Sequence, residues 1–80
     1  LLMDRLDVSE ELTRLDSHYR FFIDQSKVRG HGKKLDFILQ EFLRELNTIA
    51  SKIQSSEVQH LVVDSKNVTE KLRELIQNIE

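Results

Sequence analysis

The sequence predicts an all-α protein: a long antiparallel helical hairpin at about residues 34–54 and 57–79, packed with a preceding helix at about residues 8–25. There is no proline, and the two glycines, Gly30 and Gly32, fall in a single segment. Long helices can therefore run uninterrupted on either side of that segment. Apolar residues recur at steps of three and four in each predicted helix, which is the helical period. A short Ser-rich segment between the last two helices favours a tight turn.

The first predicted helix has a plausible start at Asp7. An aspartate caps a helix well, and Glu10 three residues later completes a pattern similar to a capping box. The apolar stripe that we expect to face the rest of the protein consists of Leu12, Leu15, Tyr19, Phe22 and Ile23. We expect Leu1, Leu2 and Leu6 to belong to the end of an earlier helix.

The two hairpin helices each carry an apolar seam with the spacing of a coiled coil. The seam of the second helix consists of Leu35, Leu39, Phe42, Leu46, Ile49 and Ile53. The third helix, for which Ser56 and Gln59 form a predicted capping box, has a seam of Val58, Leu61, Ser65, Val68, Leu72, Leu75 and Ile79. We expect these two seams to pack against each other.

Composition limits the function classes. The chain has 80 residues, a net charge of −2 and no cysteine, which excludes disulfides and thiolate metal sites and favours a reducing compartment such as the cytoplasm. No apolar run approaches the ~20 residues of a membrane span, so we expect no membrane partner. So small a core is commonly completed by self-association. The first residues resemble the cut end of a longer chain, and we expect residues 1–80 to be one domain of it.

Two carboxylates lie one helical turn apart on the polar side of the second helix. Glu41 and Glu45 could both reach a hard cation such as Mg²⁺ or Mn²⁺. Arg44 and Lys52 beside them could neutralise phosphate oxygens. The alternative is an ordinary solvated helix face with ion pairs such as Glu41–Arg44.

The segment of residues 27–34 contains four basic residues and no acid. It opens a helix, where free N–H groups attract anions, so it could contact a phosphate backbone. The alternative is an ordinary polar turn in which glycine supplies a positive φ. His18 is next to the apolar stripe of the first helix, and it is either a packing residue or an acid, base or metal ligand near the carboxylates.

Three stretches of the sequence resemble the C-terminal region of YicC-like proteins. They are RLDVSEELTRLDSH (Arg5 to His18), GKKLDFILQEFLRELNTIASK (Gly32 to Lys52) and the final KLRELIQNIE. The resemblance implies the C-terminal domain of a bacterial, cytoplasmic, metal-dependent endoribonuclease, whose larger N-terminal region is absent from this sequence. It also implies RNA as the partner, no DNA partner, and a homo-oligomer that closes as a hexameric ring in the full-length protein.

The resemblance and the residue patterns together suggest roles for individual side chains. The candidates for catalysis are His18, Glu41 and Glu45. The candidates for holding a divalent cation, Mg²⁺ or Mn²⁺, are Asp36, Glu41 and Glu45. The candidates for RNA phosphate binding are Arg14, Arg29, Lys33, Lys34, Arg44 and Lys52. The competing hypothesis is a helical module for oligomerisation or RNA binding that has no catalytic residues of its own. Under either hypothesis we expect the isolated 80-residue chain to be inactive.

Overall fold

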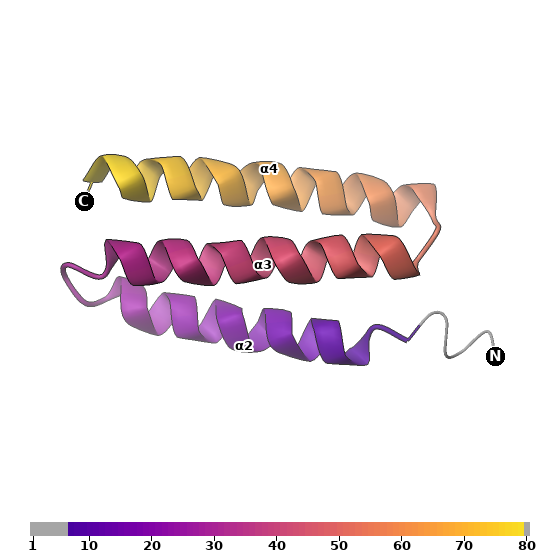
Figure 1. Cartoon of the computed structure of the whole chain (residues 1–80), viewed down its shortest axis with the longest axis horizontal. Coiled ribbons are helices and arrows are strands. Elements are labelled where there is room, and N and C mark those ends of the chain that lie inside the picture. The colour runs from indigo at the N-terminus through magenta and orange to yellow at the C-terminus, as the bar shows by residue number, and fades with distance from the viewer. Residues whose placement is uncertain (1–6, 80) are drawn as a thin grey trace.

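The computed structural model describes residues 7–79, and the side chains of residues 7–78. It consists of three helices, α2 (Ser9–Ser26), α3 (Gly32–Lys52) and α4 (Ser56–Ile79), and no strand occurs within the described range. Figure 1 shows the helices side by side, with α3 in the middle and each neighbour antiparallel to it. The predicted all-α class, the hairpin and the preceding helix are therefore confirmed. The predicted helix at Leu1, Leu2 and Leu6 lies outside the described residues.

The helix ends differ by at most two residues from the predicted ones. At the start of α2, Asp7 Oδ1 accepts hydrogen bonds from the backbone N–H of Ser9 at 2.9 Å and from its hydroxyl at 2.6 Å. The predicted pairing of Asp7 with Glu10 is therefore wrong, because Glu10 pairs with Arg14 instead. Between α2 and α3, Gly30 adopts φ +83°, a conformation that glycine reaches without strain.

The turn between α3 and α4 is held by a side chain from the second helix of the hairpin. Gln59 Nε2 donates to the carbonyl oxygens of Ala50 at 2.7 Å and Ile53 at 2.9 Å, which satisfies carbonyl groups at the end of α3. Ser55 Oγ accepts from the N–H of Val58 at 3.4 Å. The capping residue is thus Ser55, and the predicted capping box of Ser56 with Gln59 is wrong.

The apolar core lies between α3 and α4. Leu46, Ile49 and Val62 form its central cluster, and Ile38 and Leu39 are also buried. Burial of these aliphatic side chains supplies the main non-directional stabilisation of the hairpin. The predicted α3 seam is therefore confirmed at Leu39, Leu46 and Ile49.

The predicted seam of α4 is only partly confirmed. Val58 packs against the core cluster, and the side chain of Ile79 lies outside the described residues. Leu61, Val68 and Leu75 are more than half exposed, while Val62 and Thr69, one position further along, are buried. This rotation allows Arg73 to reach Asp36 on α3, at 2.7 Å, and the buried Thr69 hydroxyl donates to a backbone carbonyl of its own helix. Much of the leucine-rich stripe of α4 is consequently exposed, although Val68 and Leu72 line hollows that they share with Phe42 of α3.

The stripe predicted for α2 is also only partly confirmed. The residues that turn toward α3 are Glu11, Leu15, His18, Phe22 and Gln25, spaced by four, three, four and three. Leu12 and Tyr19 remain more than half exposed. The α2–α3 interface is therefore a mixed polar and apolar seam. None of the helices described is long and apolar enough to cross a membrane.

Candidate metal centre

Charged side chains connect α2 to α3 across their interface. Lys52 Nζ lies 2.9 Å from Glu11 Oε2, and Arg14 Nη1 lies 3.4 Å from Glu45 Oε1. Glu11 and Glu45 are only 3% and 5% exposed. The charged side of α3 is thus covered by α2, so the interpretation of a solvated face is wrong for Glu45. Carboxylates this buried are normally paired with a cation or bound to a metal.

Glu11 has an incomplete set of partners. Its Oε2 accepts from Lys52, whereas its buried Oε1 has no hydrogen-bond partner among the described residues. The hydrogen bond from Lys52 holds the pKa of Glu11 below its ordinary value. Glu11 was not predicted to be an interface residue. Its position seven residues before His18, and thus on the same helix face, is the signal that could have indicated it.

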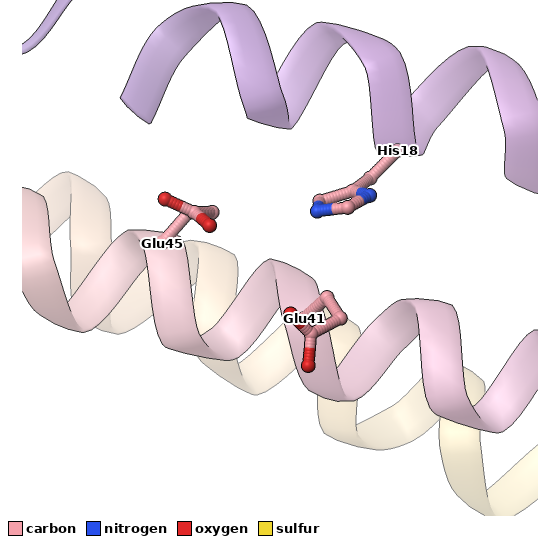
Figure 2. Close-up of side chains that lie close together, drawn as sticks. All are labelled: His18, Glu41 and Glu45. Atoms are coloured by element: carbon pink, nitrogen blue, oxygen red, sulfur yellow. The ribbon is translucent and has the colours of Figure 1, made fainter. Parts of the chain in front are cut away.

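Three predicted site residues converge one or two turns further along this interface. His18 from α2 meets Glu41 and Glu45 from α3, and one nitrogen or oxygen atom of each lies within 4.8 Å of the others. Figure 2 shows the His18 ring extending from α2 toward the two glutamates, which are on successive turns of α3. The His18 ring also lies 6.2 Å from the ring of Phe42, tilted by 57°, and this contact restricts its position.

The chemistry of these donors fits a divalent cation. Two carboxylate oxygens and one imidazole nitrogen suit Mn²⁺, while Mg²⁺ prefers oxygen ligands alone. His18 and Glu41 are half-buried and Glu45 is buried, so a bound cation would be partly screened from water. Each carboxylate of the cluster has one protein cation at a long distance among the described residues: Arg14 lies 3.4 Å from Glu45, and Arg44 lies 3.8 Å from Glu41, which is the ion pair that the alternative interpretation named. A cation bound by this cluster would compete with both contacts.

Asp36, the other predicted metal ligand, is not part of this cluster. Its carboxylate accepts from Arg73 Nε at 2.7 Å on α4 and from Gln40 Nε2 at 2.9 Å. The hydrogen bond from Arg73 lowers the pKa of Asp36 below its ordinary value. The structure therefore places Asp36 in the α3–α4 contact, and it does not bring this residue together with Glu41 and Glu45.

The predicted phosphate-binding residues fall into two groups. Arg14, Arg44 and Lys52 lie along the α2–α3 interface, and each has a carboxylate partner. The charges of Glu10 and Glu45 raise the pKa of Arg14, which keeps its guanidinium protonated.

The second group consists of Arg29, Lys33 and Lys34, which are exposed in or next to the connection between α2 and α3. Within residues 7–79 these three form no ion pair, so their charge is available to an anion. A cavity of about 350 Å³ adjoins the group, lined by residues 26–32 together with Leu35 and Ile76. Lys33 is eight residues before Glu41 on α3, about 12 Å along the helix. The basic connection is therefore separate from the His18–Glu41–Glu45 cluster.

Comparison with known proteins identifies the family. Residues 1–80 match the family described as "Endoribonuclease YicC-like, C-terminal". The chain is 44% identical over 81 aligned residues to a protein of Haemophilus influenzae named "Probable endoribonuclease YicC", covering all of this chain and 28% of that protein. It is 43% identical over 82 aligned residues to a protein of the same name from Clostridioides difficile, covering 96% of this chain and 27% of that protein.

The chain thus spans a little more than a quarter of the length of these relatives. No solved structure matches it. The match over its whole length shows that the chain belongs to the YicC-like endoribonuclease family and corresponds to the C-terminal region of that family.

Proposed function

We propose that this chain is the C-terminal part of an endoribonuclease that hydrolyses RNA. The family match and the names of the two relatives support this proposal. We place its action in the cytoplasm of a bacterium, because the chain has no cysteine and both relatives are bacterial. The proposal refers to the full-length protein, since a nuclease site normally requires several elements held together.

Glu41, Glu45 and His18 are the residues that we propose to hold a divalent cation. The observation that carries this proposal is their convergence within 4.8 Å from two different helices. Asp36, which is paired with Arg73, is replaced in this set by His18. A bound divalent cation would polarise a phosphoryl oxygen and stabilise negative charge on the leaving oxygen. Mn²⁺ is an appropriate probe because two of the three donors are carboxylates, which suit Mn²⁺.

His18 has a second possible role in the same site. Its imidazole could transfer a proton during hydrolysis instead of holding the cation. The two roles differ in measurable ways. If His18 is a ligand, His18→Gln weakens Mn²⁺ binding by about tenfold or more. If it transfers a proton, Mn²⁺ binding is unchanged and one limb of the pH–rate profile disappears.

RNA would be held by the basic residues on both sides of this cluster. Arg29, Lys33 and Lys34 are exposed at the start of α3, where the helix dipole adds to their attraction for phosphate. Arg14, Arg44 and Lys52 lie beside the carboxylates and could contact a phosphate next to the cleaved bond. These contacts depend on the negative charge of the RNA phosphates and not on the base sequence, so we expect RNA affinity to fall steeply as the salt concentration rises.

The decisive experiment measures Mn²⁺ binding and RNA cleavage by the full-length protein. The double variant Glu41→Gln with Glu45→Gln should lose cleavage and bind Mn²⁺ weakly, while its helical content persists. Glu57→Gln with Glu74→Gln is the matched control, because both residues are exposed and the same charge is removed away from the cluster. Full cleavage by the first variant would remove these carboxylates from the mechanism.

The second candidate function is an oligomerisation or RNA-binding module whose catalytic residues lie elsewhere in the protein. The observation that favours it is the exposed apolar stripe of α4, formed by Leu61, Val68, Leu72 and Leu75. Such a stripe is typical of a surface that binds protein. Under this hypothesis Leu72→Asp dissociates the full-length homo-oligomer in sedimentation experiments, and the two glutamates are dispensable for cleavage.

A further inference from the structure

Arg14 occupies an unusual position between an exposed and a buried carboxylate. Its Nη2 lies 3.0 Å from Glu10 Oε1, and its Nη1 lies 3.4 Å from Glu45 Oε1. The Glu10 side chain is 79% exposed and that of Glu45 is 7% exposed, while Arg14 itself is 48% exposed. The guanidinium therefore bridges from solvent to the carboxylate that belongs to the His18–Glu41–Glu45 cluster.

The contact with Glu45 is the weaker of the two by distance. At 3.4 Å it is longer than the usual 2.7–2.9 Å of a charge-assisted hydrogen bond. Because the guanidinium already has a solvent-side partner in Glu10, it can leave Glu45 without losing every ion pair. A second positive charge close to Glu45 would repel it strongly at these distances.

We propose that Arg14 is the counter-ion of Glu45 when no cation is bound, and that it transfers to an RNA phosphate when a cation takes Glu45. This inference rests on the proposed cation site. Arg14 and the cation compete for the same carboxylate, so each weakens the binding of the other. A released guanidinium offers two parallel N–H donors, which match the geometry of a phosphate. Cation binding and RNA binding are thereby coupled through one side chain.

The competition predicts opposite effects for the two residues that define the position of Arg14. In Arg14→Gln the competitor is absent, so the full-length protein should bind Mn²⁺ more tightly, by roughly five- to tenfold. In Glu10→Gln the guanidinium keeps only Glu45 as a partner and remains there, so Mn²⁺ binding should weaken by roughly threefold. A residue that only stabilised the fold would not shift the affinity upward when it is removed.

Matched controls separate this effect from net charge. Arg20 and Asp16 form an ion pair on the same helix, at 2.9 Å, and neither contacts Glu45. Arg20→Gln and Asp16→Asn thus make the same changes of charge without altering the counter-ion. Each control should change Mn²⁺ affinity by less than about twofold, because charges this exposed are largely screened.

The second readout is the salt dependence of RNA binding to the full-length protein, recorded on a timescale shorter than RNA cleavage. With Mn²⁺ at saturation, Arg14→Gln should reduce the slope of log affinity against log salt by about 0.7, the value for one phosphate contact on a single strand. Without Mn²⁺ the slope should not change, since Arg14 is then held by Glu45. If Arg14→Gln changes the salt slope equally with and without Mn²⁺, Arg14 does not move from Glu45 to an RNA phosphate when the cation binds.

The outcomes distinguish this inference from the proposed function. If wild type binds Mn²⁺ no better than Glu41→Gln, the cation site is wrong and the inference falls with it. If Glu41→Gln weakens Mn²⁺ binding but Arg14→Gln does not tighten it beyond Arg20→Gln, only the counter-ion role is wrong. Should Arg14→Gln lose helical content, Glu10→Gln and the charge-conserving Arg14→Lys replace it. Because lysine cannot bridge two carboxylates in the same way, Arg14→Lys should still tighten Mn²⁺ binding by roughly twofold, and unchanged or weaker binding would refute the competition.

Discussion

Replacing Glu45 by methionine should stabilise the cation-free protein while removing its response to Mn²⁺. Glu45 is 5% exposed, and its one ion-pair partner among the described residues is the half-exposed Arg14 at 3.4 Å. Methionine has nearly the same length and volume and requires no hydrogen bond. Arg14 retains Glu10 as a partner, so the substitution leaves no buried charge alone.

The expected gain in unfolding free energy follows from the burial of the Glu45 carboxylate. Removing an ionised carboxylate from water costs several kcal/mol, and a long contact with a half-exposed guanidinium offsets that cost only in part. Replacing buried ionic groups by apolar ones of similar size stabilises proteins by about 1–4 kcal/mol in favourable cases. We expect the lower part of that range, about 1–2 kcal/mol, because the cluster is close to the protein surface.

Native-state hydrogen exchange of the α2 and α3 amides in the full-length protein measures this change locally. Mn²⁺ at a hundred times its dissociation constant should add about 2.7 kcal/mol of protection to wild type and none to Glu45→Met. Glu41→Met is the matched control: its side chain is 21% exposed, so its cation-free gain should be smaller. A loss of more than about 1 kcal/mol in Glu45→Met would show that the carboxylate serves the fold, contrary to this reasoning.

Four further substitutions test the packing. The hydrogen bond from Lys52 lowers the pKa of Glu11, so the stabilisation that this pair gives to the fold is complete above about pH 4.5 and is lost as the pH falls. In urea titrations, the unfolding free energy of Lys52→Gln should therefore decrease less between about pH 5 and pH 3 than that of wild type. In the same titrations at neutral pH, Leu46→Ala should lower the unfolding free energy by about 2–4 kcal/mol, because Leu46 is buried. Leu75→Ala should lower it by less than about 0.5 kcal/mol, because Leu75 is exposed. Gln59→Ala should cost about 1–2 kcal/mol because it releases two carbonyls at the end of α3, and faster hydrogen exchange near the turn would verify the location.

The fold class and the helix boundaries could be predicted because they depend on local signals. The absence of proline, the two glycines in one short segment and the helical period of the apolar residues are each signals that act within one or two turns. The inward faces could not be predicted as well. On α4 the leucine stripe is the more apolar face, yet Val62, Thr69 and Arg73 turn toward α3. That orientation depends on a partner 37 residues away, Asp36, which a pattern within one helix does not reveal.

The candidate site was predictable to a similar extent. The one-turn spacing of Glu41 and Glu45 indicated a shared helix face, and the structure places His18 opposite that face. The spacing of Asp36 already argued against its place in this set, because the step of five residues from Asp36 to Glu41 rotates the side chain by about 140° around the helix. Glu11 and the double contact of Arg14 also depend on how α2 is placed on α3, which is tertiary information.

The two interfaces of α3 differ in a way that bears on the proposed site. The α3–α4 contact contains the buried core cluster, whereas α2 adds both apolar contacts, such as Leu15 against that cluster, and charged pairs to α3. His18 comes from α2 and the two glutamates come from α3, so a cation bound by all three would strengthen this mixed contact. By linkage, a contact that holds α2 on α3 without using a cation ligand, such as Lys52 with Glu11, must also strengthen cation binding, whereas Arg14 competes for Glu45. Lys52→Gln should therefore weaken both the α2–α3 contact and the affinity for the cation.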